Sequence, residues 1–307
     1  MSARPEPIGV PELSVGEPDR RSTAVHALRW ALAEAFQRLV RHEPGVRSGE
    51  DPEDVHQARV ATRRFRVILR QFRDVSDRTW SDDIRSDVKV LAARLGAVRD
   101  ADVLLDRLRT SVEQLAEQDR SHGHMLLDGL SQTRKSARDR LMRTLLSPGH
   151  QQLLDKMHEA VRTPRLSSDA EAKAIDVLVP LAMRAWRRVR TTVEDLGPQP
   201  TDRDLHRLRI ATKRARYAVN VVAPSVGKRA DRFTKAAAGL QDVLGDHQDA
   251  VVAQAWLRRR AAEGPALDAF VAGQLIAREQ AAVARARAAW PRAWRKLQRP
   301  KTSDWVR

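Results

Sequence analysis

Apolar residues recur every three or four positions along nearly the whole chain, which is the spacing of one face of an α-helix. The first such run extends from about Ser22 to His42, and Pro44 with Gly45 predicts its end. Its apolar positions are Val25, Leu28, Leu32, Phe36 and Leu39. The alternation that marks β-strands is missing, so the pattern predicts an all-α protein.

Further helices are expected in both halves of the chain. They cover about residues 121–146, 151–161 and 266–290, together with a helix that runs through Trp186 to Leu196. Each half is therefore expected to form a bundle of roughly four helices. The expected division is a disordered tail (1–20), a first repeat (21–163), a linker (164–170), a second repeat (171–300) and a C-terminal tail (301–307).

A helical phrase occurs twice, with its two histidines 150 positions apart. The first copy, from Val55 to Arg66, reads V-H-Q-A-R-V-A-T-R-R-F-R, and the second, from Leu205 to Arg216, reads L-H-R-L-R-I-A-T-K-R-A-R. Asp51 is expected to cap the first copy's helix, while Thr201 with Asp204 resembles a capping box for the second. Pro224 predicts the end of that second helix. The chain is thus an internal duplication.

Each copy places its charge on one side of its helix. At about 100° per residue, the basic side chains after His56 fall on its own face, opposite Phe65 and Leu69. The strip, about 21 Å long, comprises His56, Arg59, Arg63, Arg66 and Arg70 in the first copy, and His206, Arg209, Lys213 and Arg216 in the second. Arg64 and Arg214 flank the strips, and Lys89 and Lys235 are expected to add to a shared groove from neighbouring segments.

The overall charge supports a polyanionic partner. The chain has a formal net charge of +16 among 307 residues and a pI of about 11.1. Such an excess attracts polyanions, and the planar fork of arginine suits phosphate oxygens. The sequence has no cysteine and no apolar stretch of membrane-spanning length, so neither thiolate chemistry nor a transmembrane segment is expected.

A second repeated phrase follows each motif helix. It reads L-G-A-V-R-D-A-D-V from Leu95 to Val103 and L-G-D-H-Q-D-A-V-V from Leu244 to Val252. A repeated glycine within a helical pattern indicates either close helix packing or a break between helices. Asp100 and Asp249 are expected to orient a neighbouring arginine or to cap a helix, in preference to a catalytic role.

Together these phrases resemble the CHAD family, the conserved histidine α-helical domain, from about Ser22 to Arg299. The resemblance implies two pseudo-symmetric helical bundles around a basic groove that binds inorganic polyphosphate. It also implies that the binding residues are His56, Arg59, Arg63, Arg66, His206, Arg209, Lys213 and Arg216. The protein is then expected to be a non-catalytic binder without metal or cofactor, located in the cytoplasm with polyphosphate granules.

Two other functions stay open at this point. A metal-dependent phosphohydrolase would need ligands such as His122 with His124, or Asp246 with His247 and Asp249, although no recurrent metal spacing joins them. A nucleic-acid binder is compatible with the net charge, but aromatic residues make up only 4% of the chain and the strips lack stacking rings. No specific nucleic-acid partner is therefore expected. Trp30, Trp186 and Trp256 are expected to pack in the core. Trp290, Trp294 and Trp305 are expected to pack with the last helix, in preference to forming a membrane-surface or partner patch.

Overall fold

The structure, a computed structural model, describes residues 13–303 and is all-α, as the pattern predicts. The helices are α1 (Ala24–Ser48), α2 (Pro52–Gln71), α3 (Arg78–Val112), α4 (Glu117–Leu145), α5 (Pro148–Arg162), α6 (Ala174–Glu194), α7 (Asp202–Val226), α8 (Lys228–Glu263), α9 (Ala266–Gln298) and α10 (Pro300–Ser303). Two short 3-10 turns, Phe72–Val75 and Ser168–Glu171, lie between helices. Among the helices described, none is both long and apolar enough to cross a bilayer.

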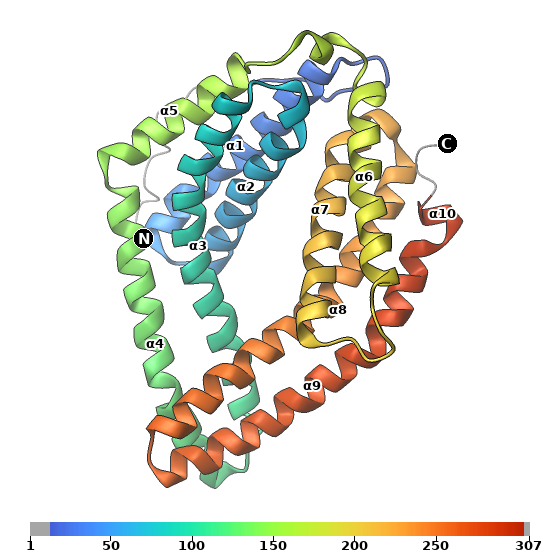
Figure 1. Cartoon of the computed structure of the whole chain (residues 1–307). Helices are drawn as coiled ribbons and strands as arrows, with labels where there is room; N and C mark the ends of the chain where they lie inside the picture. The colour runs from blue at the N-terminus through green and yellow to red at the C-terminus, as the bar shows by residue number, and fades with distance from the viewer. Residues whose placement is uncertain (1–12, 304–307) are drawn as a thin grey trace.

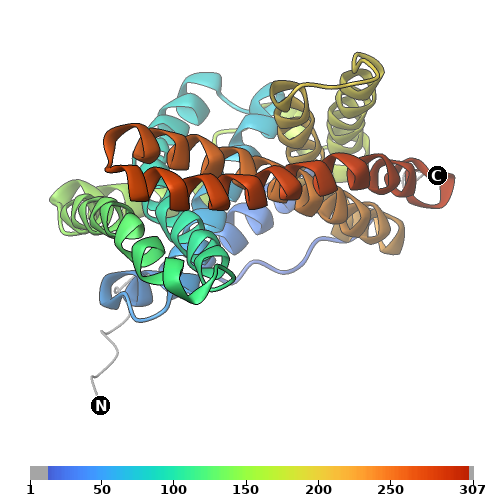
Figure 2. The ribbon, with the colours of Figure 1, turned by 90° about the horizontal axis from the view of Figure 1, so that it is seen from below.

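The helices form two groups, which the loop between α5 and α6 joins at the top of Figure 1 and α8 with α9 joins at the bottom. One group holds α1 to α5, and the other holds α6, α7 and the beginning of α8. The remaining length of α8, paired with α9, crosses toward the far ends of α3 and α4 (Figures 1 and 2). Buried leucines, valines and alanines of these four helices form a small core of their own, while a larger core spans both groups. Through this small core, α8 and α9 are packed against the first group.

Three predicted helix ends are wrong, for the same physical reason. α9 continues past the expected end at about residue 290 and through Pro291 to Gln298, and its last turns bury Trp294 and Leu297. α1 continues through Pro44 to Ser48, and α7 continues through Pro224 to Val226. A proline removes one backbone hydrogen bond, but the residues that follow, Val46 and Ser225, are fully buried. Tertiary packing therefore outweighs the local cost of each proline.

Gly45 lies inside α1 because α2 begins directly against it. A Cβ atom there would come within 1.9 Å of Asp54 Oδ2. The carboxylate of Asp54 instead reaches His42, whose Nδ1 lies 2.7 Å from Asp54 Oδ1. The end of α1 is provided by Gly49, which adopts the left-handed conformation (φ 74°).

The predicted starts of the two motif helices are confirmed. Asp51 Oδ1 accepts a hydrogen bond from the backbone N–H of Glu53 (2.8 Å) at the start of α2. At the start of α7, Thr201 and Asp204 form a complete capping box. The two motif copies thus lie in α2 and α7.

The N-terminal stretch and the tryptophans complete the packing. Residues 1–12 lie outside the described part of the chain, but Leu13 and Val15 pack against the large core, which differs from the disordered tail expected for 1–20. Trp186 is buried, and its ring lies 5.6 Å from that of Trp294. Trp256 is only half-buried at the edge of the small core. Trp305 lies outside the described part of the chain.

Candidate functional site

The two motif helices face one groove with a volume of about 710 Å³. α2 and α7 contribute their charged faces, and α3 and α8 form the remaining walls. Seven guanidinium or ammonium groups line it: Arg59, Arg63, Arg99, Arg107, Arg209, Lys213 and Arg216. Four carboxylates accompany them: Asp100, Asp242, Asp246 and Asp249. Positive charge is therefore in excess in the groove.

The repeated glycines lie beneath the first arginine of each motif. A Cβ on Gly96 would lie 3.9 Å from Arg59 Cζ, and one on Gly245 would lie 4.0 Å from Arg209 Nε. Both glycines are inside continuous helices, α3 and α8, so the repeat does not mark a break between helices. A Cβ at either position would meet its arginine at ordinary van der Waals distance, so an alanine would fit beneath each arginine.

Asp100 orients Arg59, as the sequence predicts. Arg59 Nη2 donates to Asp100 Oδ1 at 2.8 Å. The carboxylate side chain is 71% exposed, whereas that of Arg59 is 27% exposed. In the other half, Asp249 lies near Arg209 and Arg107. Its pKa is raised, because the effect of burial exceeds the opposite effect of these two arginines. Each half thus places an aspartate beside the first arginine of its motif.

Tyr217 links the two halves across the groove. Arg63 Nε on α2 donates to the hydroxyl of Tyr217 on α7 (2.8 Å). The guanidinium carbons of Arg63 and Arg216 each lie 5.5 Å from the centre of the tyrosine ring, a cation–π arrangement. The ring is buried, so both arginines are held in place by a single side chain.

Lys213 occupies the least favourable electrostatic position. Burial, followed by the charges of Arg63, Arg209, Arg59 and Arg216, lowers the pKa of its ammonium group to about 7. Burial also lowers the pKa of Arg63. The groove therefore holds more positive charge than its own carboxylates neutralise.

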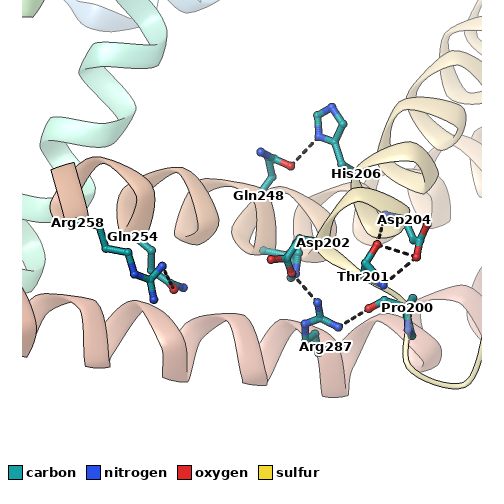
Figure 3. A network of polar contacts seen from close by, with 10 residues as sticks. Pro200, Thr201, Asp202, Asp204, His206, Gln248, Gln254, Arg258 and Arg287 are labelled. Carbon is teal, nitrogen blue, oxygen red and sulfur yellow. Dashed lines mark hydrogen bonds and ion pairs between the residues drawn. The ribbon is translucent and has the colours of Figure 1, made fainter.

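The two motif histidines have different surroundings. His206 Nδ1 lies 2.6 Å from Gln248 Oε1 on α8 (Figure 3), and Gln248 in turn lines the groove. His56 lines the groove itself, and its pKa is lowered first by burial and then by the charge of Arg99. Of the two motif histidines, His56 thus lines the groove directly, and His206 contacts a lining residue, Gln248.

Several of the predicted basic residues lie outside the groove lining. Arg66 and Arg70 are beyond its end on α2. Burial lowers the pKa of Arg70, and the charges of Arg214 and Arg85 lower it further. Arg64 is on another face, close to Arg38 and Glu34. Lys89 and Lys235 are exposed on the outer surfaces of α3 and α8. The groove therefore uses only part of each predicted strip.

Sequence reasoning did not identify Arg99, Arg107 and Tyr217 as groove residues. Arg99 lies within the repeated L-G-A-V-R-D phrase, and this repetition could have identified it as a groove residue. Arg107 is held by the buried Glu279 on α9, whose Oε2 accepts from its Nε at 2.7 Å. A contact between residues so far apart in the chain leaves no local pattern.

The residues suggested for a metal site are separated from one another. His247 is buried and turned toward Asp202, with Nε2 to Oδ1 3.0 Å, whereas Asp246 and Asp249 line the groove. His124 lies 3.1 Å from Glu113. Within residues 13–303, no group of three or more histidine, aspartate or glutamate side chains is arranged to hold a metal ion.

The start of α7 is fixed by α9. Arg287 donates to the carbonyl of Pro200 and to the carboxylate of Asp202, both at 2.5 Å (Figure 3). These bonds join the end of the preceding loop and the first turn of α7 to the long helix α9. The orientation of the second motif helix, and so of its basic face, depends on this connection.

Comparison with known proteins agrees with the arrangement of helices and phrases. Residues 30–258 match the CHAD domain family. The chain belongs to the CHAD domain family. The CHAD domain of the plant Ricinus communis has a TM-score of 0.69 at 26% identity, covering 90% of this chain and 95% of that one. PptA from Streptomyces chartreusis has a TM-score of 0.74 at 23% identity, covering 89% of this chain and 100% of that one.

Curated relatives of the CHAD chain extend beyond it. Uncharacterised proteins from two strains of Mycobacterium tuberculosis are 30% identical over 275 residues. The match covers 87% of this chain but 52% of each relative, so the chain spans about half the length of the curated relatives it matches.

Proposed function

We propose that this CHAD domain binds inorganic polyphosphate in the groove between α2, α3, α7 and α8, without catalysis. The observation that carries the proposal is Lys213, a half-buried amine that lines the groove among four arginines. Repulsion between these charges destabilises the free protein, and a linear ligand with closely spaced negative charges relieves this repulsion. We expect the protein at cytoplasmic granules, where polyphosphate accumulates.

The shape of the groove supports a slender polyanion. Its cationic groups come from three helices, α2, α3 and α7, and line a space of about 710 Å³, so a single flexible chain can be contacted from several sides. A DNA duplex presents its phosphates on the outside of a wide cylinder and can meet only the rim. Tyr217 is the aromatic residue of the groove lining. Its ring is buried and already contacted by the guanidinium groups of Arg63 and Arg216, so it offers no surface on which a base could stack.

The placement of the carboxylates supports binding without catalysis. Hydrolysis of a phosphoanhydride commonly requires metal ions or a group that activates the attacking water. In this groove Asp100 accepts from Arg59, and Asp249 lies beside Arg209 and Arg107. These acids serve to balance arginine charge. We therefore expect no release of phosphate from polyphosphate with Mg²⁺ or Mn²⁺ present.

Parallel titrations with polyphosphate, duplex DNA and ATP at two salt concentrations test the proposal. Affinity for polyphosphate is expected to increase with chain length and to exceed that for DNA at physiological salt. Because binding releases counterions, the logarithm of the affinity should fall linearly with the logarithm of the salt concentration. A preference for DNA at physiological salt would overturn the proposal.

Asp100→Asn is expected to increase polyphosphate affinity several-fold. Asp100 accepts a hydrogen bond from Arg59, and a phosphate that binds Arg59 must displace this carboxylate. Asp87→Asn is a matched control on the same helix, since Asp87 is exposed and pairs with Lys156 outside the groove. Isothermal titration at fixed salt compares them; equal effects of the two substitutions would show that only net charge matters.

A further inference from the structure

A second hollow, of about 440 Å³, adjoins the basic groove between α3, α4 and α8. The two share Asp100, Leu104 and Val252 in their linings. The side chain of Asp100 is 71% exposed and Val252 is 44% exposed. The boundary between the hollows is therefore a solvent-exposed rim that a ligand can cross.

The second hollow differs from the groove in chemical character. Its floor is apolar, formed by Ala97, Ala101, Leu104 and Leu130. Trp256 also lines it and is half-buried, packed against the small core on one side. Sequence reasoning placed this tryptophan in the core, but part of its indole is accessible. An accessible indole beside an apolar floor is a surface on which a planar ring can stack.

Positive charge lies beside this apolar surface. Arg259 and Arg260 line the hollow next to Trp256. Arg260 Nε is buried and has no hydrogen-bond partner within the described chain. Glu263 also lines the hollow, and its Oε2 lies 3.9 Å from Arg260 Nη1. The hollow thus combines a place for an aromatic ring with N–H donors for the acceptor atoms at the edge of that ring.

We propose that the hollow holds the base of a purine nucleoside oligophosphate whose phosphates extend into the basic groove. The base stacks against Trp256, and the phosphate chain crosses the rim at Val252 toward Arg59 and Arg107. The hollow's volume lies in the range of pockets for small ligands, roughly 300–1,000 Å³. This inference rests on the proposed function, because the groove must bind the phosphates.

Comparing ATP with inorganic tripolyphosphate isolates the contribution of the base, because both ligands carry three phosphates. ATP is expected to bind the full chain about tenfold more tightly, although tripolyphosphate carries the greater charge. Trp256→Leu should remove this advantage while leaving the affinities for tripolyphosphate and long-chain polyphosphate within twofold. Trp256→Phe, which retains a ring for stacking, should recover most of it.

Three results distinguish the possibilities. Equal affinities for ATP and tripolyphosphate, together with tight binding of long polyphosphate, would overturn this inference and leave the proposed function intact. Failure of every phosphate ligand to bind would overturn both. Thermal unfolding checks that Trp256→Leu is folded; if it is not, Arg259→Ala replaces it, since Arg259 is exposed. That variant should weaken ATP several-fold and spare tripolyphosphate, and equal losses for both ligands would also overturn the inference.

Discussion

Replacing Arg59 and Arg209 together by alanine is expected to weaken polyphosphate binding at least about a hundredfold. Each arginine is the first of its motif and lies over the repeated glycine of the neighbouring helix, so the double substitution affects both walls. A hydrogen bond to a charged group contributes about 1.5–3 kcal/mol, and two such losses correspond to about a hundredfold or more in affinity. Isothermal titration with long-chain polyphosphate at moderate salt measures the change.

The matched control for the double variant is Arg188→Ala with Arg190→Ala. Both residues are exposed on α6 and lie outside the groove, and the change in net charge is the same. We expect the control to lose less than about threefold, through the long-range field alone. Unchanged affinity in the Arg59→Ala, Arg209→Ala variant would refute the assignment of the groove. Folding should persist, because Asp100, the partner of Arg59, is largely exposed.

The architecture of the protein could be predicted largely from its sequence, because apolar periodicity and repeated phrases report local structure. The errors at Pro44 and Pro224 show the limit of this reasoning. A proline marks a local cost, but whether a helix continues depends on what the next turn buries. In α1 the next turn buries Val46, which is a property of the assembled bundle.

The site could be predicted in part. Arg59, Arg63, Arg209, Lys213 and Arg216 are brought together in one groove from two helices. A helical wheel gives the angular position of a side chain but not the point at which a neighbouring helix crosses. α2 and α7 approach each other beyond the groove, where Gln71 Nε2 donates to the carbonyl of Arg214. The strip residues near that end, Arg66 and Arg70, therefore do not line the groove.

The contribution of Tyr217 could not be predicted from the repeat. The equivalent position of the first motif copy is Val67, so comparison of the two copies treats the position as variable and apolar. Its role depends on a hydrogen bond to Arg63, a residue 154 positions earlier. The duplication explains the matched features of the groove, and the differences between the copies explain how its two sides are joined.

Lys213→Met is expected to stabilise the free protein at pH 7 and below while weakening polyphosphate binding. Burial and four neighbouring arginines lower the pKa of Lys213 from 10.5 to about 7. The unfolded chain binds this proton up to about pH 10.5, so the folded state is penalised in full below pH 7, and the penalty decreases as the pH rises from 7 toward 10.5. Since one pKa unit corresponds to about 1.4 kcal/mol, we expect a gain of at least about 1 kcal/mol at pH 7, measured by urea unfolding.

The pH dependence identifies the origin of this stabilisation. The advantage of Lys213→Met over the unsubstituted protein should shrink as the pH rises from 7 to 10, whereas Lys235→Met, at an exposed position on α8, should show no such trend. Bound polyphosphate raises the pKa of Lys213, so binding at pH 8 should take up a proton, measurable by titration in buffers of different ionisation enthalpy. Loss of that uptake in Lys213→Met is expected. An advantage that stays constant with pH would instead indicate a packing effect of the methionine, and would remove the electrostatic argument for a polyanion in the groove.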